Sequence, residues 1–181
     1  MSLAHQRVVI IGGTSGIGLA TARAALDAGA EVIIGSSRQS SVDAALSELS
    51  AGTTGYAVDG SSEESLRRFF EKVGPFDHLA FTAGEPLSLL AVDGMDIAAA
   101  RDFFQIRYFG ALSAVSIGCP SIREGGSITL TSGSARTRPG AGWSVPASIC
   151  GAVTSLAKAL AVELAPLRVN SVEPGVVRSP L

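Results

Sequence analysis

The stretch from Arg7 to Gly18 constrains the fold of this chain more than any other part of it. Val8 to Ile11 is a short run of β-branched residues, which is typical of a buried strand. Glycines then stand at positions 12, 13, 16 and 18, and a run of helix-forming residues follows from Leu19 to Gly29. Glycines let a backbone turn tightly and approach an anion closely, and a helix N-terminus presents free N–H groups to it. The stretch therefore predicts a phosphate-binding turn between a strand and a helix.

The spacing of these glycines is Gly-x-x-x-Gly-x-Gly. Ordinary dinucleotide dehydrogenases have Gly-x-Gly-x-x-Gly instead, and a P-loop would need a Lys after the last glycine. A tight strand-to-helix turn without a ligand is the alternative interpretation. The pattern resembles the cofactor loop of short-chain dehydrogenase/reductases, in which Thr usually stands where this chain has Ile11. The resemblance implies that the loop residues that hold the cofactor are Gly12, Thr14, Ser15, Gly16, Ile17 and Gly18.

The rest of the chain alternates between strand-like and helix-like segments. This alternation predicts an α/β fold, a three-layer Rossmann domain with a doubly wound parallel sheet, and we expect the strand order 3-2-1-4-5-6 over one NAD(P)-binding domain, residues 1–181. After the first strand we expect strands over Ala30–Gly35, Thr53–Val58, Phe76–Gly84, Gly126–Thr131 and Arg168–Val172. After the first helix we expect helices over Ser41–Leu49, over a segment opened by a capping box at Ser61–Glu64, over Ala98–Ile117 and over Ile149–Leu164.

The composition narrows the function classes. Hydrophobic residues make up 46% of the 181 residues and charged residues 17%, so the chain is globular, and its net charge of −2 without a basic block disfavours nucleic acid as a partner. We expect no membrane-spanning segment and no signal peptide, and the two cysteines suggest neither a disulfide framework nor a metal site. We expect a cytoplasmic protein that binds a small-molecule substrate and no membrane.

Arg38 lies twenty residues after Gly18, where dinucleotide-binding folds place the group that meets the adenosine ribose. An acidic residue there selects NAD, whereas an Arg accommodates the 2′-phosphate of NADP. Ser37 and Arg38 offer a hydroxyl and a cation, which predicts NADP(H) as the preferred cofactor over NAD(H). The alternative is that Arg38 is an ordinary surface residue.

The resemblance implies further cofactor contacts. Asp59, with Gly60, stands where the family contacts adenine, although Asp59 is also suited to a turn or a helix cap. Ala83 and Gly84 keep the small pair that lies beside the cofactor, while Phe81 and Thr82 replace the two usual Asn. At the nicotinamide end the family has Pro-Gly-x-x-x-Thr, and the matching residues here are Pro174, Gly175, Val177 and Ser179.

The catalytic residues of the family are not in place. The family uses a Tyr as proton donor or acceptor, a Lys four residues later, a Ser thirteen residues before the Tyr, and an Asn on the fourth helix. The segment Leu160–Pro166 resembles the end of the catalytic helix, and counting back from it puts Pro146 at the Tyr position, Cys150 at the Lys position and Gly133 at the Ser position. Arg107 stands at the Asn position, and no Tyr-x-x-x-Lys occurs anywhere in the chain.

Ser132 and Ser134 flank the lost Ser, and Arg107 offers a fixed positive charge to a developing oxyanion. These three are the candidate catalytic residues, although serines at helix starts also serve as caps. Two functions remain open. One is an NADP(H)-dependent oxidoreductase for a small carbonyl or alcohol, with water or a serine as proton source. The other is a non-catalytic NADP(H)-binding protein that acts as a sensor or a partner subunit.

The resembled family usually continues past this point through a substrate loop and a seventh strand. The chain ends at Leu181, so we expect an exposed edge at the sixth strand unless the chain is incomplete or a partner subunit covers that edge. The resemblance also implies a homodimer or homotetramer, formed through the long helices that contain Phe104 and Leu156.

Overall fold

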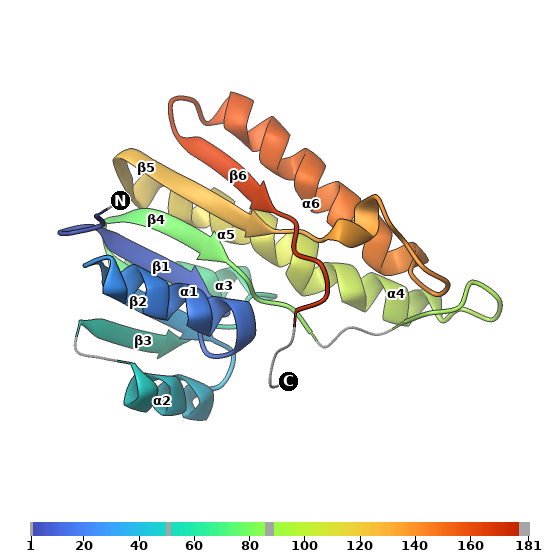
Figure 1. The fold of residues 1–181 in the computed structure, drawn as a ribbon, viewed down its shortest axis with the longest axis horizontal. Coiled ribbons are helices and arrows are strands. Elements are labelled where there is room, and N and C mark those ends of the chain that lie inside the picture. Colours follow the sequence, from blue (N-terminus) through green and yellow to red (C-terminus); the bar gives the residue numbers. More distant parts are fainter. Residues whose placement is uncertain (1, 50–51, 86–88, 178–181) are drawn as a thin grey trace.

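The structure, a computed structural model, describes residues 2–49, 52–85 and 89–177. These residues form a six-stranded parallel sheet in the order β3-β2-β1-β4-β5-β6, which confirms the predicted fold class and strand order. Figure 1 shows the sheet with helices packed on both of its faces. The strands are β1 (Arg7–Ile11), β2 (Glu31–Ser36), β3 (Thr53–Ala57), β4 (Phe76–Phe81), β5 (Ile122–Thr131) and β6 (Arg168–Val172).

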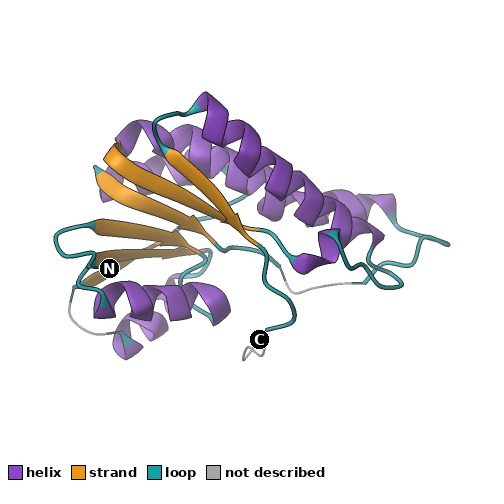
Figure 2. Ribbon diagram, turned by 45° about the horizontal axis from the view of Figure 1, so that its top comes forward, coloured by secondary structure: helices purple, strands orange, loops and turns teal. Residues whose placement is uncertain are grey.

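The helices divide between the two faces of the sheet, as Figure 2 shows from a second direction. One face carries α1 (Gly16–Asp27) and α2 (Gln39–Glu48). The other face carries α3 (Glu63–Val73), α4 (Ile97–Phe104), α5 (Ala111–Gly118) and α6 (Ser144–Glu163). The short turns are η1, a π-helical turn over Gln105–Gly110, and the 3-10 turns η2 (Cys119–Ser121) and η3 (Ser134–Arg136).

The β-branched run of β1 explains why it lies at the centre of the sheet. Val9 and Ile11 pack into the core beneath α3, α5 and α6, and Val8 and Ile10 pack into a second core beneath α1 and α2. Successive side chains of a strand point to opposite faces, so only a strand that is apolar at every position can be buried on both faces.

Most predicted elements are confirmed, and several of them start at a different residue from the one expected. α6 begins at Ser144, five residues before the expected start, because Pro146 falls in the first turn, where a helix needs no N–H. The capping residue of α3 is Ser62, whose hydroxyl accepts a hydrogen bond from the Ser65 N–H at 3.2 Å, so the helix begins one residue later than the capping box implied. β5 begins four residues earlier than expected, at Ile122.

The fourth helix also differs from the prediction. A continuous helix was expected over Ala98–Ile117, but the chain forms α4, then the π-helical turn η1, then α5. A π turn contains an extra residue relative to an α turn and is found frequently at functional sites. Arg107 lies on this turn, so the irregularity sits where the family's Asn position falls.

Helix α6 is the one helix of the described residues that is long and apolar enough to resemble a membrane span. Over its most hydrophobic stretch the mean hydropathy is 1.6, and its 20 residues are long enough to cross a membrane by length and composition alone. The helix also packs Ile149, Val153, Ala157 and Leu160 into the core of the fold. The core helix of a globular fold can have the same length and composition as a membrane span.

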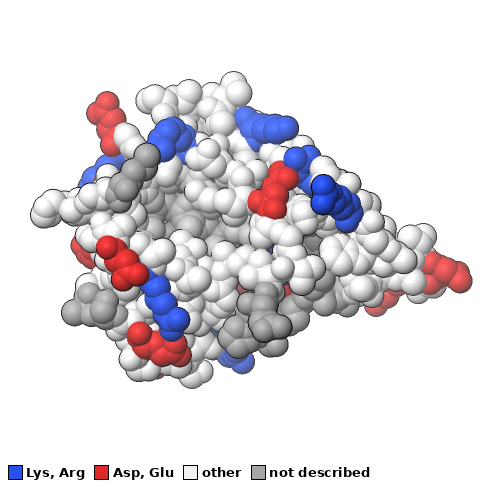
Figure 3. Space-filling view, viewed as in Figure 1, with Lys and Arg blue, Asp and Glu red and all other residues white. Residues whose placement is uncertain are grey.

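The face that carries α1 is open over β4, β5 and β6. A groove of about 1030 Å³ runs there, lined by His78, Thr82, Ser127, Thr129 and Arg168 among others. Figure 3 shows this side of the molecule hollowed near its centre, with the charged side chains mostly around the rim. Among the described residues β6 pairs with β5 alone, so the expected open edge of the sheet is present.

Candidate functional site

A cleft of about 500 Å³ opens at the carboxyl ends of the parallel strands, the usual place for a ligand in an open α/β sheet. Each of the loops that follow the six strands contributes to its wall. The wall is completed by residues from η1 and from the start of α6: Ile106, Arg107, Trp143, Pro146 and Cys150.

The glycine loop after β1 is packed so closely that side chains are excluded from it. A Cβ atom on Gly18 would lie 2.1 Å from the Gly12 carbonyl oxygen, and one on Gly12 would lie 2.5 Å from the Ala83 nitrogen. Gly12 and Gly16 also have positive φ angles, 92° and 51°. The Ser15 side chain makes no capping hydrogen bond at the start of α1. The loop and the first turn of α1 therefore fit the diphosphate of a dinucleotide, and they are the residues that would hold it.

The other end of the cleft would receive the adenosine. Thr14 Oγ1 donates to Ser36 Oγ at 3.0 Å, which ties the glycine loop to the end of β2. Asp59 Oδ1 accepts hydrogen bonds from the Ser61 N–H at 2.9 Å and from its hydroxyl at 2.6 Å. The Asp59 carboxylate therefore forms a turn, the alternative role considered for it, while the residue also lines the cleft.

The structure brings nearly all the predicted cofactor residues together. The cleft is lined by Gly12, Thr14, Ser15, Gly16, Ile17, Gly18, Ser37, Asp59, Gly60, Ala83, Gly84, Pro174, Gly175 and Val177. Arg38 is exposed at the N-cap of α2 and is not part of the lining. Ser179 lies outside the described residues.

Arg107, in the wall of the cleft, is held by three contacts to two residues, Glu85 and Phe103. Its guanidinium donates to the Glu85 backbone carbonyl, lies 3.6 Å from the Glu85 carboxylate, and sits over the Phe103 ring at 5.5 Å. A Cβ atom on Gly84 would lie 2.6 Å from the Arg107 Cζ, so only glycine leaves room for this placement. Glu85 was not among the residues expected to lie here.

Ser132 and Ser134 both line the cleft, but their surroundings differ. The Ser132 hydroxyl lies 2.8 Å from the Cys150 carbonyl oxygen and 2.9 Å from Thr154 Oγ1. Ser134 begins η3, and its Oγ faces Gly175 across the mouth of the cleft, 3.8 Å from where a Cβ of that glycine would sit.

A hydrogen-bonded chain continues from Ser132 to the loop after β6. Thr154 Oγ1 donates to Glu173 Oε1 at 3.0 Å, and Arg136 Nε lies 2.7 Å from the same carboxylate oxygen. The hydrogen bond from Arg136 lowers the pKa of Glu173 below its usual value, and the Thr154 hydroxyl adds to that effect. Burial raises the pKa of the Cys150 thiol, although Arg107 and Ser132 oppose the shift. The thiol in the cleft wall is thus neutral, and the carboxylate at the far end of this hydrogen-bonded chain is ionised.

Thr154 and Glu173 are residues that sequence reasoning missed. Thr154 follows Cys150 by four residues, so helical spacing could have placed the two on one face of α6. Glu173 precedes the Pro-Gly turn directly, and no sequence pattern indicated that its side chain folds back onto α6.

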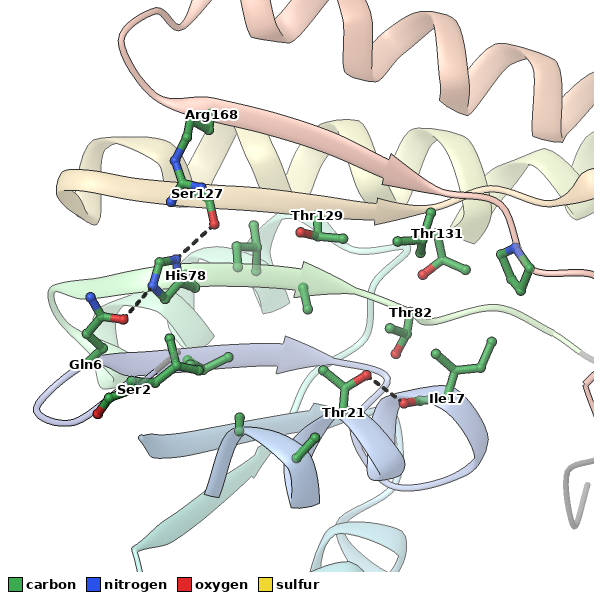
Figure 4. A pocket seen from close by; sticks show the side chains of 18 of the residues that line it. Ser2, Gln6, Ile17, Thr21, His78, Thr82, Ser127, Thr129, Thr131 and Arg168 are labelled. Carbon is green, nitrogen blue, oxygen red and sulfur yellow. Dashed lines mark hydrogen bonds between the residues drawn. The ribbon is translucent and has the colours of Figure 1, made fainter. Parts of the chain in front are cut away.

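His78 lies away from this cleft, near the start of β4. Figure 4 shows it in the groove on the open sheet face, between Gln6 and Ser127. Its ring nitrogens lie 3.0 Å from Gln6 Oε1 and 2.9 Å from Ser127 Oγ, so its observed contacts are structural.

Comparisons with known proteins agree with this geometry. The family model of the SDR-like Rossmann domain matches residues 1–181. The chain is 41% identical to the short-chain dehydrogenase/reductase ucsE of Acremonium sp over 98% of its own length and 74% of that protein, and 32% identical to the L-xylulose reductase of Mesocricetus auratus over 98% and 74%. Its structure resembles that of a small-chain dehydrogenase in complex with NADPH, with a TM-score of 0.77 and 32% identity over 96% of this chain and 72% of that one.

The glycine cradle, the strand order and these matches lead to one conclusion. The chain belongs to the short-chain dehydrogenase/reductase family.

Proposed function

We propose that the protein is an NADP(H)-dependent oxidoreductase that interconverts a small carbonyl and an alcohol through a non-standard active site. The observation that carries this proposal is the cleft itself. Its glycine cradle excludes side chains where the dinucleotide diphosphate would lie, and Arg107, Ser132 and Ser134 line the same cleft. The bound nicotinamide would supply the hydride or accept it.

The residues of the chain would have separate tasks in this reaction. Arg107 presents a fixed positive charge to the substrate oxygen, where negative charge develops as a carbonyl is reduced. Ser132 and Ser134 offer hydroxyl groups that orient the substrate oxygen. The NADPH bound by the similar dehydrogenase structure supports the choice of cofactor, together with Ser37 and Arg38 at the end of β2.

Trp143 provides the first test because it is the only Trp of the chain and lines the cleft. Its fluorescence is followed while NADPH, and then NADH, is added. We expect saturable quenching with much tighter binding of NADPH, and Arg38→Ala should weaken NADPH binding roughly 10-fold or more while leaving NADH unchanged, because a charge-assisted hydrogen bond contributes about 1.5–3 kcal/mol. Equal affinity for the two cofactors in the parent would contradict the NADP preference.

Turnover is tested separately by following NADPH oxidation with L-xylulose and a panel of small ketones, and NADP⁺ reduction with the matching alcohols. L-xylulose is included because it is the substrate in the name of one relative. Consumption of NADPH that depends on the substrate supports the proposal. Binding of NADPH without turnover of any substrate rejects it.

The second candidate function, a non-catalytic NADP(H)-binding sensor or partner subunit, is favoured by Pro146 and Cys150 at the Tyr and Lys positions. The double variant Pro146→Tyr with Cys150→Lys separates the two. Activity that appears in the variant from an inactive parent favours the non-catalytic function, and activity in the parent excludes it.

A further inference from the structure

We propose that Ser132, Thr154 and Glu173 form a proton relay that connects the floor of the cleft to solvent and removes the hydroxyl proton of an alcohol substrate. The inference rests on the proposed oxidoreductase function and adds a route for the proton, which the missing Tyr and Lys leave unassigned. It depends on the hydrogen-bonded chain from Ser132 through Thr154 to the carboxylate of Glu173.

The donors in this chain can be assigned from the number of protons. Each hydroxyl carries one proton, and the ionised Glu173 can only accept, so Thr154 must give its proton to Glu173 Oε1. Ser132 is then the donor in its contacts, and its one hydroxyl proton is shared between two acceptors, the Cys150 carbonyl oxygen at 2.8 Å and Thr154 Oγ1 at 2.9 Å. The Ser132 hydroxyl proton therefore points into α6, toward Thr154 and the Cys150 carbonyl, and its oxygen presents lone pairs to the cleft.

This polarity decides which way the relay can work. A hydroxyl that offers lone pairs accepts a hydrogen bond from an alcohol, but it has no proton to give to a carbonyl. As the alcohol is oxidised, its hydroxyl proton moves to Ser132 Oγ, the Ser132 proton moves to Thr154 Oγ1, and the Thr154 proton moves to the Glu173 carboxylate. A bound oxidised nicotinamide cofactor would accept the C–H hydride with both electrons, so the alcohol would become a carbonyl and one proton would be left on Glu173. Carbonyl reduction requires the same chain to run in reverse from a protonated Glu173.

The burial of the three residues suits this role. Thr154 is 5% exposed and is the buried polar residue of the part of the chain that the structure describes, so its hydroxyl is shielded from competing water. Glu173 is partly exposed, with 26% of its side chain accessible, so it can return the proton to solvent. The relay therefore runs from Ser132 in the cleft, through the buried Thr154 hydroxyl, to the partly exposed Glu173 carboxylate.

The charged groups around Glu173 keep its carboxylate ionised and therefore able to accept a proton. Arg136 of η3 contacts its carboxylate, Lys158 of α6 adds a more distant positive charge, and the Cys150 thiol feels the negative charge of Glu173 from the cleft side. With its pKa below the usual value, Glu173 is ionised at neutral pH, and it loses this capacity only in acid.

The first experiment compares Thr154→Val with Thr154→Ser. Val keeps the shape of the buried side chain and removes the hydroxyl, whereas Ser keeps the hydroxyl. We expect Thr154→Val to slow alcohol oxidation in the panel roughly 10-fold or more, since a positioned proton acceptor contributes about 10²–10⁴ to the rate, and Thr154→Ser to restore most of it. NADPH binding, measured with Trp143, and the unfolding midpoint show whether each variant remains folded.

The pH dependence of the rate of alcohol oxidation distinguishes a proton relay from hydrogen bonds that only stabilise the fold. Arg136→Gln removes the main cause of the low Glu173 pKa, so the acid limb of alcohol oxidation should move to higher pH, and Glu173→Gln should abolish that limb together with most of the rate. A purely structural role would lower the rate equally at all pH values, and that result would overturn the relay.

A measurement without cofactor or turnover tests the same connection. We would follow alkylation of Cys150 by iodoacetamide in the cofactor-free protein, with Cys119 in the same sample as the internal control. Glu173→Gln removes a negative charge, so it should lower the Cys150 thiol pKa and speed its alkylation at fixed pH, while Cys119 stays unchanged. An unchanged rate at Cys150 would overturn the inference.

The outcomes separate the relay from the proposed function. If the parent turns over a substrate and Thr154→Val matches it, only the relay fails. If the parent binds NADPH and turns over nothing in the panel, the oxidoreductase function fails, and the relay fails with it.

Discussion

Gly18 illustrates how a single absent side chain shapes the candidate cofactor site. Replacing it with Ala would put a Cβ atom 2.1 Å from the Gly12 carbonyl oxygen, and backbone on both sides of the contact cannot move aside. We expect Gly18→Ala to lower the free energy of unfolding by about 1–3 kcal/mol, the usual cost of overpacking, and to abolish NADPH binding. Chemical denaturation and the Trp143 titration measure the two effects.

Gly151 is the matched control for this substitution. It lies in α6 with no heavy atom within 4 Å of the position that a Cβ would take, so Ala fits there without contact. Because Gly disfavours a helix interior relative to Ala by about 1 kcal/mol, Gly151→Ala should stabilise the protein and leave NADPH binding unchanged. A Gly18→Ala protein as stable as the parent would show that the loop is not close-packed.

Whether a residue of the candidate site could be predicted from the sequence depends on how close its structural partners lie along the chain. The glycine loop was predictable because its function depends on local backbone geometry, which glycine spacing records directly. Glu85 and Glu173 were not, because each side chain meets its partner from a distant element, Arg107 and Thr154 respectively. Sequence spacing carries no information about such contacts.

At the scale of elements, His78 links three segments, since it bonds Gln6 before β1 and Ser127 on β5 from its own place on β4. Burial lowers its pKa, with Arg168 acting in the same direction and Asp77 opposing it. The unfolded chain therefore binds a proton near the ordinary His pKa while the folded chain does not. As the pH falls from about 7 to about 5, the folded state should lose stability, and Tm should fall.

His78→Gln should flatten this dependence of Tm on pH, because Gln does not titrate. The only other histidine, His5, is exposed, so His5→Gln should leave the slope as it is in the parent. Equal slopes in all three proteins would show that His78 does not control the acid sensitivity in this range. Glu173 does not affect the comparison, because it is present in all three proteins and contributes the same acid sensitivity to each.

The elements themselves were largely predictable, and the exceptions have local causes. Strands β1, β3 and β6 agree with the expected segments to within one residue, since β-branched runs and glycine turns mark their ends. The π-helical turn η1 was not predictable, because its extra residue is accommodated by packing, with Gly110 close against the Gly60 carbonyl. The start of α6 was predicted too late because the regular apolar spacing begins only at Ile149, whereas the first turn of the helix also accommodates Pro146.

At the scale of the whole molecule, an aromatic surface on the helical face bears on assembly. Phe109 is 50% exposed, and its ring contacts Tyr108, which contacts Phe104 in turn. A surface of this kind, beside helix α6 with Leu156, fits a helix-mediated interface. We expect a dimer or tetramer in solution, and Phe109→Asp should reduce the mass measured by light scattering toward that of one chain.

Val92 supplies the control for that experiment. It is 74% exposed in the loop before α4, so Val92→Asp adds the same charge away from the aromatic surface and should leave the mass unchanged. A parent protein with the mass of a single chain would contradict the expectation directly.

The π-helical turn has a consequence for how such a site could change during evolution. A π turn takes up its extra residue locally, so deleting one residue within Gln105–Gly110 would let α4 and α5 join in a regular helix in their present orientations. The deletion would re-aim only the side chains of the turn, by up to the roughly 100° that one residue of an α-helix spans. No substitution moves a side chain as far. The position of Arg107 is therefore encoded in the length of the chain as well as in its residue type, and single-codon insertions and deletions at this turn offer a short route between different arrangements of charge in one cleft.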